Sequence, residues 1–153
     1  GDGVLNFEIE GVVFVPNICF ESTVPHLVRN MMQQSNTQGQ RGDVMLNLTN
    51  DGWFWGSAML DIHLRCNVMR AVEMRRPNLV AANTGISAWI TPTGKIVQQE
   101  AKRKDGFVIA QVGTATYDSV YMRFGDILSI VAATLAGVAV LRSFESVSPN
   151  IKN

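Results

Sequence analysis

The sequence is poor in the residues that build metal sites and disulfide frameworks. Its 153 residues include two cysteines, Cys19 and Cys66, and two histidines, His26 and His63. Two cysteines on different predicted elements are too few for a disulfide framework, although a single bridge between them stays open. The histidines are 37 positions apart, and neither has a partner at metal-ligand spacing, which argues against a zinc site. We therefore expect no metal and no cofactor.

The chain also lacks an excess of charge of either sign, with 13 Lys and Arg against 13 Asp and Glu. Nucleic-acid-binding proteins usually carry a basic patch, and the short basic run at 102–104 is typical of a solvated turn. We expect no nucleic-acid partner. The length allows one domain with a real core. The chain opens with Gly1-Asp2-Gly3, without an initiator Met or a signal peptide, which indicates a fragment or a processed piece.

Apolar periodicity predicts strands and helices in an α/β order. Residues 4–10 alternate apolar and polar, as in a half-buried strand, and the continuous run 12–15 indicates a strand buried on both faces. Pro25 suits the first turn of a helix, and Pro77 ends another. The remaining predicted elements are helices over 24–34 and 57–76 and strands over 44–48, 79–82, 86–90, 96–97 and 106–112, with a hairpin turn at 92–95.

Cys19 falls at the predicted turn between the first apolar run and the helix that begins near Val24. A cysteine at such a turn can present its sulfur outward, and nearby backbone amides can stabilise negative charge. That arrangement favours a nucleophile. The alternative is a buried cysteine that packs as a small hydrophobe.

A second unusual stretch follows the predicted strand 44–48. Asn50-Asp51-Gly52 signals a turn, and three aromatic residues come directly after it, Trp53, Phe54 and Trp55. Ligands of open α/β sheets bind at the carboxyl ends of the strands, so this loop is expected to line a pocket. A loop folded back onto the core is the alternative.

Residues 127–141 carry no charge. Fifteen helical residues span about 22 Å, short of a hydrocarbon core of about 30 Å, but the wider segment 124–144 closes the gap. A membrane span and a buried core helix both remain open, and Arg123 and Arg142 on either side do not settle an orientation. We divide the chain into a domain portion at 1–113, a connector at 114–125, a transmembrane helix at 126–144 and a polar tail at 145–153.

Seven short motifs are distributed along nearly the whole of residues 11–144. They are Ile18–Glu21, Asn47–Phe54, His63–Leu64, Arg70–Pro77, Ala82–Ser87, Pro92–Lys95 and Arg123–Asp126, the last before an apolar helix. Together they resemble the carbon–nitrogen hydrolase (nitrilase) superfamily. Within it they look like the membrane branch, the apolipoprotein N-acyltransferases.

The resemblance implies part of a four-layer αββα sandwich, followed by a carboxyl-terminal transmembrane helix. It also implies a Glu-Lys-Cys catalytic set in which Cys19 is the nucleophile, whereas the Glu and the Lys lie upstream of this chain. The backbone N–H of Phe20 would help to hold the oxyanion, and Glu21 would support the site. The branch often has Tyr at the position of Phe20, which puts a polar role there in doubt.

By the same resemblance, a thioester on Cys19 would carry a fatty acyl chain from a phospholipid donor to the N-terminal amine of an apolipoprotein acceptor. The expected setting is a multi-pass protein of the bacterial inner membrane with its catalytic domain in the periplasm, and the missing N-terminal half of the same protein is an implied partner. The expected substrate-binding residues are Asn50, Trp53, Phe54, Asn83 and Thr84, although core packing and turn formation are alternatives for them. His63 is expected to be a hydrogen-bonded helix residue.

Two other functions stay open. A soluble carbon–nitrogen hydrolase would use the same cysteine with water as acceptor, and the apolar helix would then belong to a core or an interface. Alternatively, the chain is an inactive fragment, because it lacks two of the three catalytic groups. We expect no turnover from residues 1–153 alone.

Overall fold

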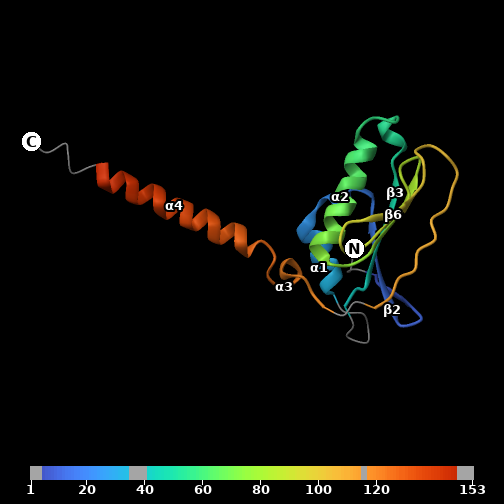
Figure 1. Cartoon of the computed structure of the whole chain (residues 1–153), viewed down its shortest axis with the longest axis horizontal. Coiled ribbons are helices and arrows are strands. Elements are labelled where there is room, and N and C mark those ends of the chain that lie inside the picture. Colours follow the sequence, from blue (N-terminus) through green and yellow to red (C-terminus); the bar gives the residue numbers. More distant parts are fainter. Residues whose placement is uncertain (1–4, 35–40, 115–116, 148–153) are drawn as a thin grey trace, which may run out of the picture. The chain divides into compact units, whose positions relative to one another are not determined.

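The computed structural model describes residues 5–34, 41–114 and 117–147, with the side chains of 145–147 left out. Val4 of the first predicted strand and residues 148–153 of the predicted tail lie outside the described residues. The chain divides into two compact units, Gly1–Arg123 and Phe124–Asn153. Figure 1 shows the first as a sheet with helices and the second as a long helix.

The first unit is built on a six-stranded mixed sheet whose strands follow one another in chain order. The strands are β1 (Phe7–Ile9), β2 (Val12–Ile18), β3 (Val44–Asn50), β4 (Asn78–Asn83), β5 (Ala88–Ile90) and β6 (Ile96–Gln99). β2, β3 and β4 are parallel, whereas β1, β5 and β6 pair antiparallel to their neighbours. The carboxyl ends of the three parallel strands therefore meet at one edge of the sheet.

Helices make the crossovers between the parallel strands. Between β2 and β3 lie η1 (Cys19–Thr23) and α1 (Pro25–Gln33). Between β3 and β4 lie η2 (Gly52–Phe54) and α2 (Met59–Met74). Two further helices, α3 (Val120–Phe124) and α4 (Ile127–Val147), follow the sheet in the chain. Pro25 lies in the first turn of α1, where its missing N–H removes no helical hydrogen bond. α1 packs against β2, and α2 packs against β4 and β5.

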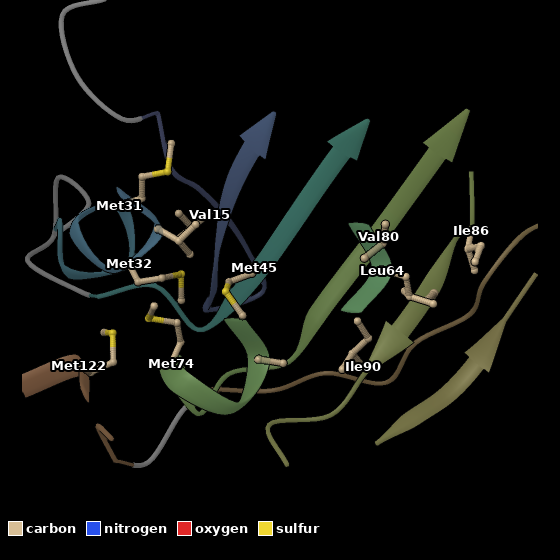
Figure 2. Packing of buried hydrophobic residues seen from close by; sticks show 13 residues of the cluster. Val15, Met31, Met32, Met45, Leu64, Met74, Val80, Ile86, Ile90 and Met122 are labelled. Carbon is tan, nitrogen blue, oxygen red and sulfur yellow. The ribbon is translucent and has the colours of Figure 1, made fainter. Parts of the chain in front are cut away.

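The core between the sheet and the helices is rich in methionine. Five of the seven methionines in the chain belong to it, Met31, Met32, Met45, Met74 and Met122. Figure 2 shows the side chains of Met32, Met74 and Met122 gathered near one another, with aliphatic residues such as Val80, Leu64 and Ile90 farther along the sheet. Methionine is flexible enough to fill the irregular space where α1, α2 and α3 converge on the strands.

The predicted order of elements is confirmed up to β6, but two burial predictions for the first strands are wrong. In β2, Val13 and Val15 are buried while the alternate residues are partly exposed, because helices cover only one face. In β1, Phe7 and Ile9 are 41% and 54% exposed. β1 is the edge strand, and the Phe7 ring stacks on Phe14, which points away from the face that holds Val13 and Val15.

The predicted strand at 106–112 is also wrong, because the structure has no strand there. The Gln98 side chain replaces a backbone ladder: its Nε2 donates to the Phe107 carbonyl at 3.1 Å, and its Oε1 accepts from the Ile109 amide at 3.2 Å. Apolar residues of this segment line one cavity of about 370 Å³ with residues of the sheet such as Leu46 and Leu79. The apolar pattern therefore reflects contact with the sheet rather than membership of it.

Candidate active site

Cys19 begins η1 directly after the parallel strand β2, which confirms the predicted strand-to-helix turn. It is a free, partly buried thiol. Its φ of +52° lies in the left-handed region, which residues other than glycine rarely adopt. Such a conformation persists only where the surroundings hold it, and it marks a candidate functional position.

Three side chains hold the Cys19 carbonyl oxygen from inside the domain. Asn47 Nδ2 donates to it at 3.0 Å, Ser22 Oγ donates to it at 3.1 Å, and His63 Nε2 lies 3.2 Å away. We call Ser22, Asn47 and His63 the carbonyl clamp. None of the three is more than 2% exposed, so water does not compete for these contacts.

Asp51 fixes the imidazole of His63 from the other side. Its Oδ1 lies 3.0 Å from His63 Nδ1 and also accepts from Thr49 Oγ1 at 2.8 Å. His63 Nε2 also lies 2.9 Å from Ser22 Oγ, so the two ring nitrogens contact Asp51 on one side and Ser22 with the Cys19 carbonyl on the other. The expectation that His63 is a hydrogen-bonded helix residue is confirmed.

The clamp belongs to a larger set of buried polar residues between α2 and the parallel strands. Asn67 on α2 donates to Asn47 Oδ1 at 3.3 Å, and Asn78 at the start of β4 donates to Asn67 Oδ1 at 2.9 Å. Asn47 also donates to Asn17 Oδ1 at 2.7 Å. All four asparagines are at most 2% exposed. Sequence reasoning missed this set, although asparagine is disfavoured inside apolar strands and its recurrence there was a signal.

Aromatic side chains cover the outer side of the turn. The Phe20 ring stacks on the His63 imidazole with centroids 5.1 Å apart, and the Phe54 ring lies 5.5 Å from Phe20. Trp53 and Trp55 are 79% and 82% exposed, so these two indoles are not folded back onto the core. The loop that follows β3 therefore contacts the Cys19 turn through the Phe54 ring, and its two tryptophan side chains are exposed to solvent.

The remaining predicted site residues lie at the same edge of the sheet. Asn50 Oδ1 accepts from the Gly52 amide at 3.1 Å and from Asn83 Nδ2 at 3.4 Å. Thr84, at φ +64°, follows Asn83 and lines a cavity of about 30 Å³ with Asp51 and other residues of the neighbouring loop. These contacts show that Asn50 and Asn83 belong to turns at the ends of β3 and β4, and that Thr84 lies near Asp51.

Glu21 has a defined structural contact within the turn. Its Oε2 accepts from the Ile18 amide at 2.6 Å and so closes the first turn of η1. Within the described part of the chain, no group of three His, Cys, Asp or Glu side chains is placed to hold a metal ion. The chemistry that this arrangement offers is a thiol on a rigid, hydrogen-bonded turn.

The second unit contains an apolar helix. Residues Ile127–Phe144 of α4 have a mean hydropathy of 2.0, and among the described residues this is the one stretch long and apolar enough to cross a membrane. The 21 residues of α4 span about 31 Å at 1.5 Å per residue, which matches the thickness of a hydrocarbon core.

Comparison with known proteins gives a consistent result. The carbon-nitrogen hydrolase family matches residues 1–121. The chain is 39% identical over 137 residues to the apolipoprotein N-acyltransferase of Rhodopirellula baltica, covering 87% of this chain and 24% of that protein. It is 35% identical over 128 residues to the enzyme of the same name from Bradyrhizobium diazoefficiens, covering 84% and 22%. The chain thus spans about a quarter of the length of these curated relatives.

Solved structures show the same fold. A carbon-nitrogen hydrolase superfamily protein from Xanthomonas campestris superimposes with a TM-score of 0.54 at 22% identity, covering 84% of this chain and 51% of that one. The mixed α/β sheet and its helices are therefore of the nitrilase type. With the family match over residues 1–121, this places the chain in the carbon-nitrogen hydrolase family.

Proposed function

We propose that this chain is the carboxyl-terminal part of an apolipoprotein N-acyltransferase, which moves a fatty acyl chain from a phospholipid to a lipoprotein amine. The similarity to two proteins of that name over more than four-fifths of the chain supports the proposal. The apolar helix α4 supports it as well, because both substrates carry acyl chains and reside in a membrane.

The reaction would begin at Cys19. Its thiolate attacks the ester carbonyl of the phospholipid, and the thiol proton passes to a general base, which the family resemblance assigns to a Glu upstream of this chain. A tetrahedral oxyanion forms, and the backbone N–H of Phe20 is the donor that this chain offers it. Collapse breaks the carbon–oxygen ester bond, releases a lysophospholipid and leaves a thioester on Cys19.

The second step uses the amine of the lipoprotein. The upstream base has by then given the thiol proton to the departing lysophospholipid. The α-amine of a diacylglyceryl-cysteine attacks the thioester carbon, the carbon–sulfur bond breaks, and an amide forms as one amine proton passes to the same base and the Cys19 thiolate returns. The loops that carry Asn50, Trp53, Phe54, Asn83 and Thr84 border the turn and would line the path of the substrates. Glu21 would keep the turn closed through its contact with the Ile18 amide.

The setting proposed for the whole protein is the bacterial inner membrane, with several spans and a periplasmic catalytic domain. α4 would be one of these spans, with Arg123 before it and Arg142 in its carboxyl-terminal part. The exposed indoles of Trp53 and Trp55 suit a membrane-water interface, where aromatic rings are enriched.

The observation that carries the proposal is the placement of Cys19, a free thiol held at φ +52° at the carboxyl edge of the parallel strands. The test is acyl transfer by the full-length protein in phospholipid vesicles, with a diacylated lipopeptide as acceptor and mass spectrometry as readout. Cys19→Ser should lower the rate at least about a thousandfold, since loss of a nucleophile removes the covalent step.

Cys66→Ser is the matched control, because Cys66 is also a free, partly buried thiol but lies on α2. It should retain transfer. Transfer that survives Cys19→Ser would overturn the proposal. Release of free fatty acid or ammonia without any amide product would instead favour a carbon–nitrogen hydrolase that uses water as its acceptor.

A further inference from the structure

The peptide group between Cys19 and Phe20 links the carbonyl clamp to the candidate site. No described peptide bond is cis, so the Cys19 carbonyl and the Phe20 N–H point in opposite directions from one planar unit. The clamp holds the carbonyl toward the buried side. The N–H of Phe20 is thereby turned away from the buried polar residues, toward the side on which a substrate would lie.

The clamp draws its members from separate parts of the fold. Asn47 comes from β3, Ser22 from η1 and His63 from α2, and all three converge on one oxygen atom. A typical backbone carbonyl at a strand end needs one partner. Hydrogen bonds accepted by a carbonyl also polarise the N–H of the same peptide unit, which makes it a stronger donor.

The order Ser22, His63, Asp51 repeats the hydrogen-bonding order of a serine-hydrolase triad, with distances of 2.9 Å and 3.0 Å. Ser22 cannot act as a nucleophile here, because it is 0% exposed and its hydroxyl donates to the Cys19 carbonyl. The three residues instead form a chain of contacts that connects Asp51, at the end of β3, to the peptide that follows Cys19.

We propose that the carbonyl clamp, oriented by Asp51, is a positioning device that aims and polarises the Phe20 N–H as the oxyanion donor of the acylation step. Its members touch neither substrate nor thiol, and they act through the peptide unit. The inference rests on the proposed role of Cys19 as nucleophile, but it does not depend on which acceptor takes the acyl group.

The test compares two reactions of Cys19 in the full-length protein. With p-nitrophenyl butyrate, the thiolate forms a bond to the acyl carbon, an oxyanion develops, and p-nitrophenolate leaves as the carbon–oxygen bond breaks. With iodoacetamide, the thiolate displaces iodide and no oxyanion forms. A defect in the oxyanion donor slows only the first reaction, whereas a distorted turn or an altered thiolate changes both.

A pair of substitutions at His63 separates the two ring nitrogens. His63→Gln can present an amide near the position of Nε2, which faces the Cys19 carbonyl, whereas His63→Asn can present one only near Nδ1, which faces Asp51. His63→Asn should slow acylation by about tenfold to hundredfold, less than the roughly hundredfold to thousandfold loss for a removed oxyanion donor, because the Phe20 N–H would be misaligned and not lost. His63→Gln should recover part of that loss, and alkylation should change less than about threefold in both.

Two further variants distinguish a selective effect on acylation from a general loss of folding. Ser22→Ala removes one donor with little change in volume and should slow acylation in the same selective way. Met74→Ala is the matched control, because Met74 is 0% exposed like Ser22 but lies in the apolar core near the carboxyl end of α2, outside the polar set around Asn47. It should lower the melting temperature while the ratio of the two rates stays at the wild-type value.

Equal losses of acylation and alkylation in the clamp variants, or the same selective loss in Met74→Ala, would overturn the inference. Selective loss in a protein that acylates Cys19 but transfers nothing to the lipopeptide would uphold the inference and refute the proposed acceptor. A wild-type protein that forms no butyryl thioester at Cys19 would refute both proposals.

Discussion

The Phe20 ring lies flat on the His63 imidazole, with the two planes 7° apart and their centroids separated by 5.1 Å. The residue after the candidate nucleophile thus contacts the clamp through its side chain as well as through its peptide group. The stack covers the outer side of the imidazole, while Asp51 contacts its Nδ1 and Ser22 contacts its Nε2. Any change to Phe20 therefore also acts on His63.

Phe20→Leu tests this stack. An aromatic pair contributes about 0.5–1.5 kcal/mol beyond its buried area, so the substitution should destabilise the domain by about 1 kcal/mol and slow acylation of Cys19. Phe20→Tyr keeps the ring and should retain both. Thermal unfolding and p-nitrophenol release measure the two effects, and a fully stable, fully active Phe20→Leu variant would contradict the prediction.

Gly85→Ala tests the contact between the loop after β4 and Asp51. A Cβ at Gly85 would overlap Asp51 Oδ2 and lie 2.9 Å from Ala82 Cβ, so the carboxylate must shift from its position beside His63. We expect slower acylation and a destabilisation of about 1–3 kcal/mol. Gly113→Ala is the control, since its Cβ would meet no atom within 4 Å. Unchanged acylation in Gly85→Ala would argue that Asp51 does not orient the imidazole.

Met74→Ala tests the methionine-rich core. Met74 is 0% exposed, and truncation of such a side chain should lower the free energy of unfolding by about 2–5 kcal/mol. Met69 on the same helix is 56% exposed, and its replacement by Ala should change stability by less than about 0.5 kcal/mol. Denaturant titration compares the two variants, and similar midpoints would contradict the packing described above.

Arg29→Ala tests the attachment of α3 to the domain. The Arg29 side chain donates to the carbonyl oxygens of Tyr121, Met122 and Arg123 at 2.9–3.1 Å. Its loss leaves the last carbonyls of this short helix without their charged donor, which should cost about 1–3 kcal/mol. Hydrogen exchange of amides 120–124 should accelerate, whereas Arg65→Ala, at an exposed position of α2, should leave it unchanged.

Ala136→Arg tests the membrane assignment of α4. Arg at the centre of a spanning helix opposes insertion by about 2.5–3.5 kcal/mol. A reporter fused to the carboxyl terminus of the full-length protein, active on only one side of the membrane, should change its sidedness in Ala136→Arg and keep it in Ala136→Leu. The same sidedness in both variants would indicate a helix that does not span the membrane.

Local sequence patterns were sufficient to predict the order of elements up to β6 and the turn at Cys19. The continuous apolar run of β2, the proline at the start of α1 and the Asn-Asp-Gly turn after β3 are signals carried by neighbouring residues. The ends of parallel strands must meet at one edge, so the proximity of Cys19 to the loop after β3 followed from topology.

The carbonyl clamp could not be predicted in the same way, because its members are 28 to 44 positions from Cys19, apart from Ser22. A spacing of four places His63 and Asn67 on one face of α2, but the pattern does not say which carbonyl they meet. The error at 106–112 has a similar cause: Gln98 replaces the backbone partner that a strand would need, and no local pattern indicates this.

The distance in sequence between Cys19 and His63 also bears on the order of events during synthesis. Contacts that join residues far apart form only after the intervening chain has been made and its loop closed. A nascent chain that ends before residue 63 holds the cysteine without the imidazole beneath its carbonyl. The contacts that hold the Cys19 carbonyl are therefore expected to form late, once β3 and α2 have docked.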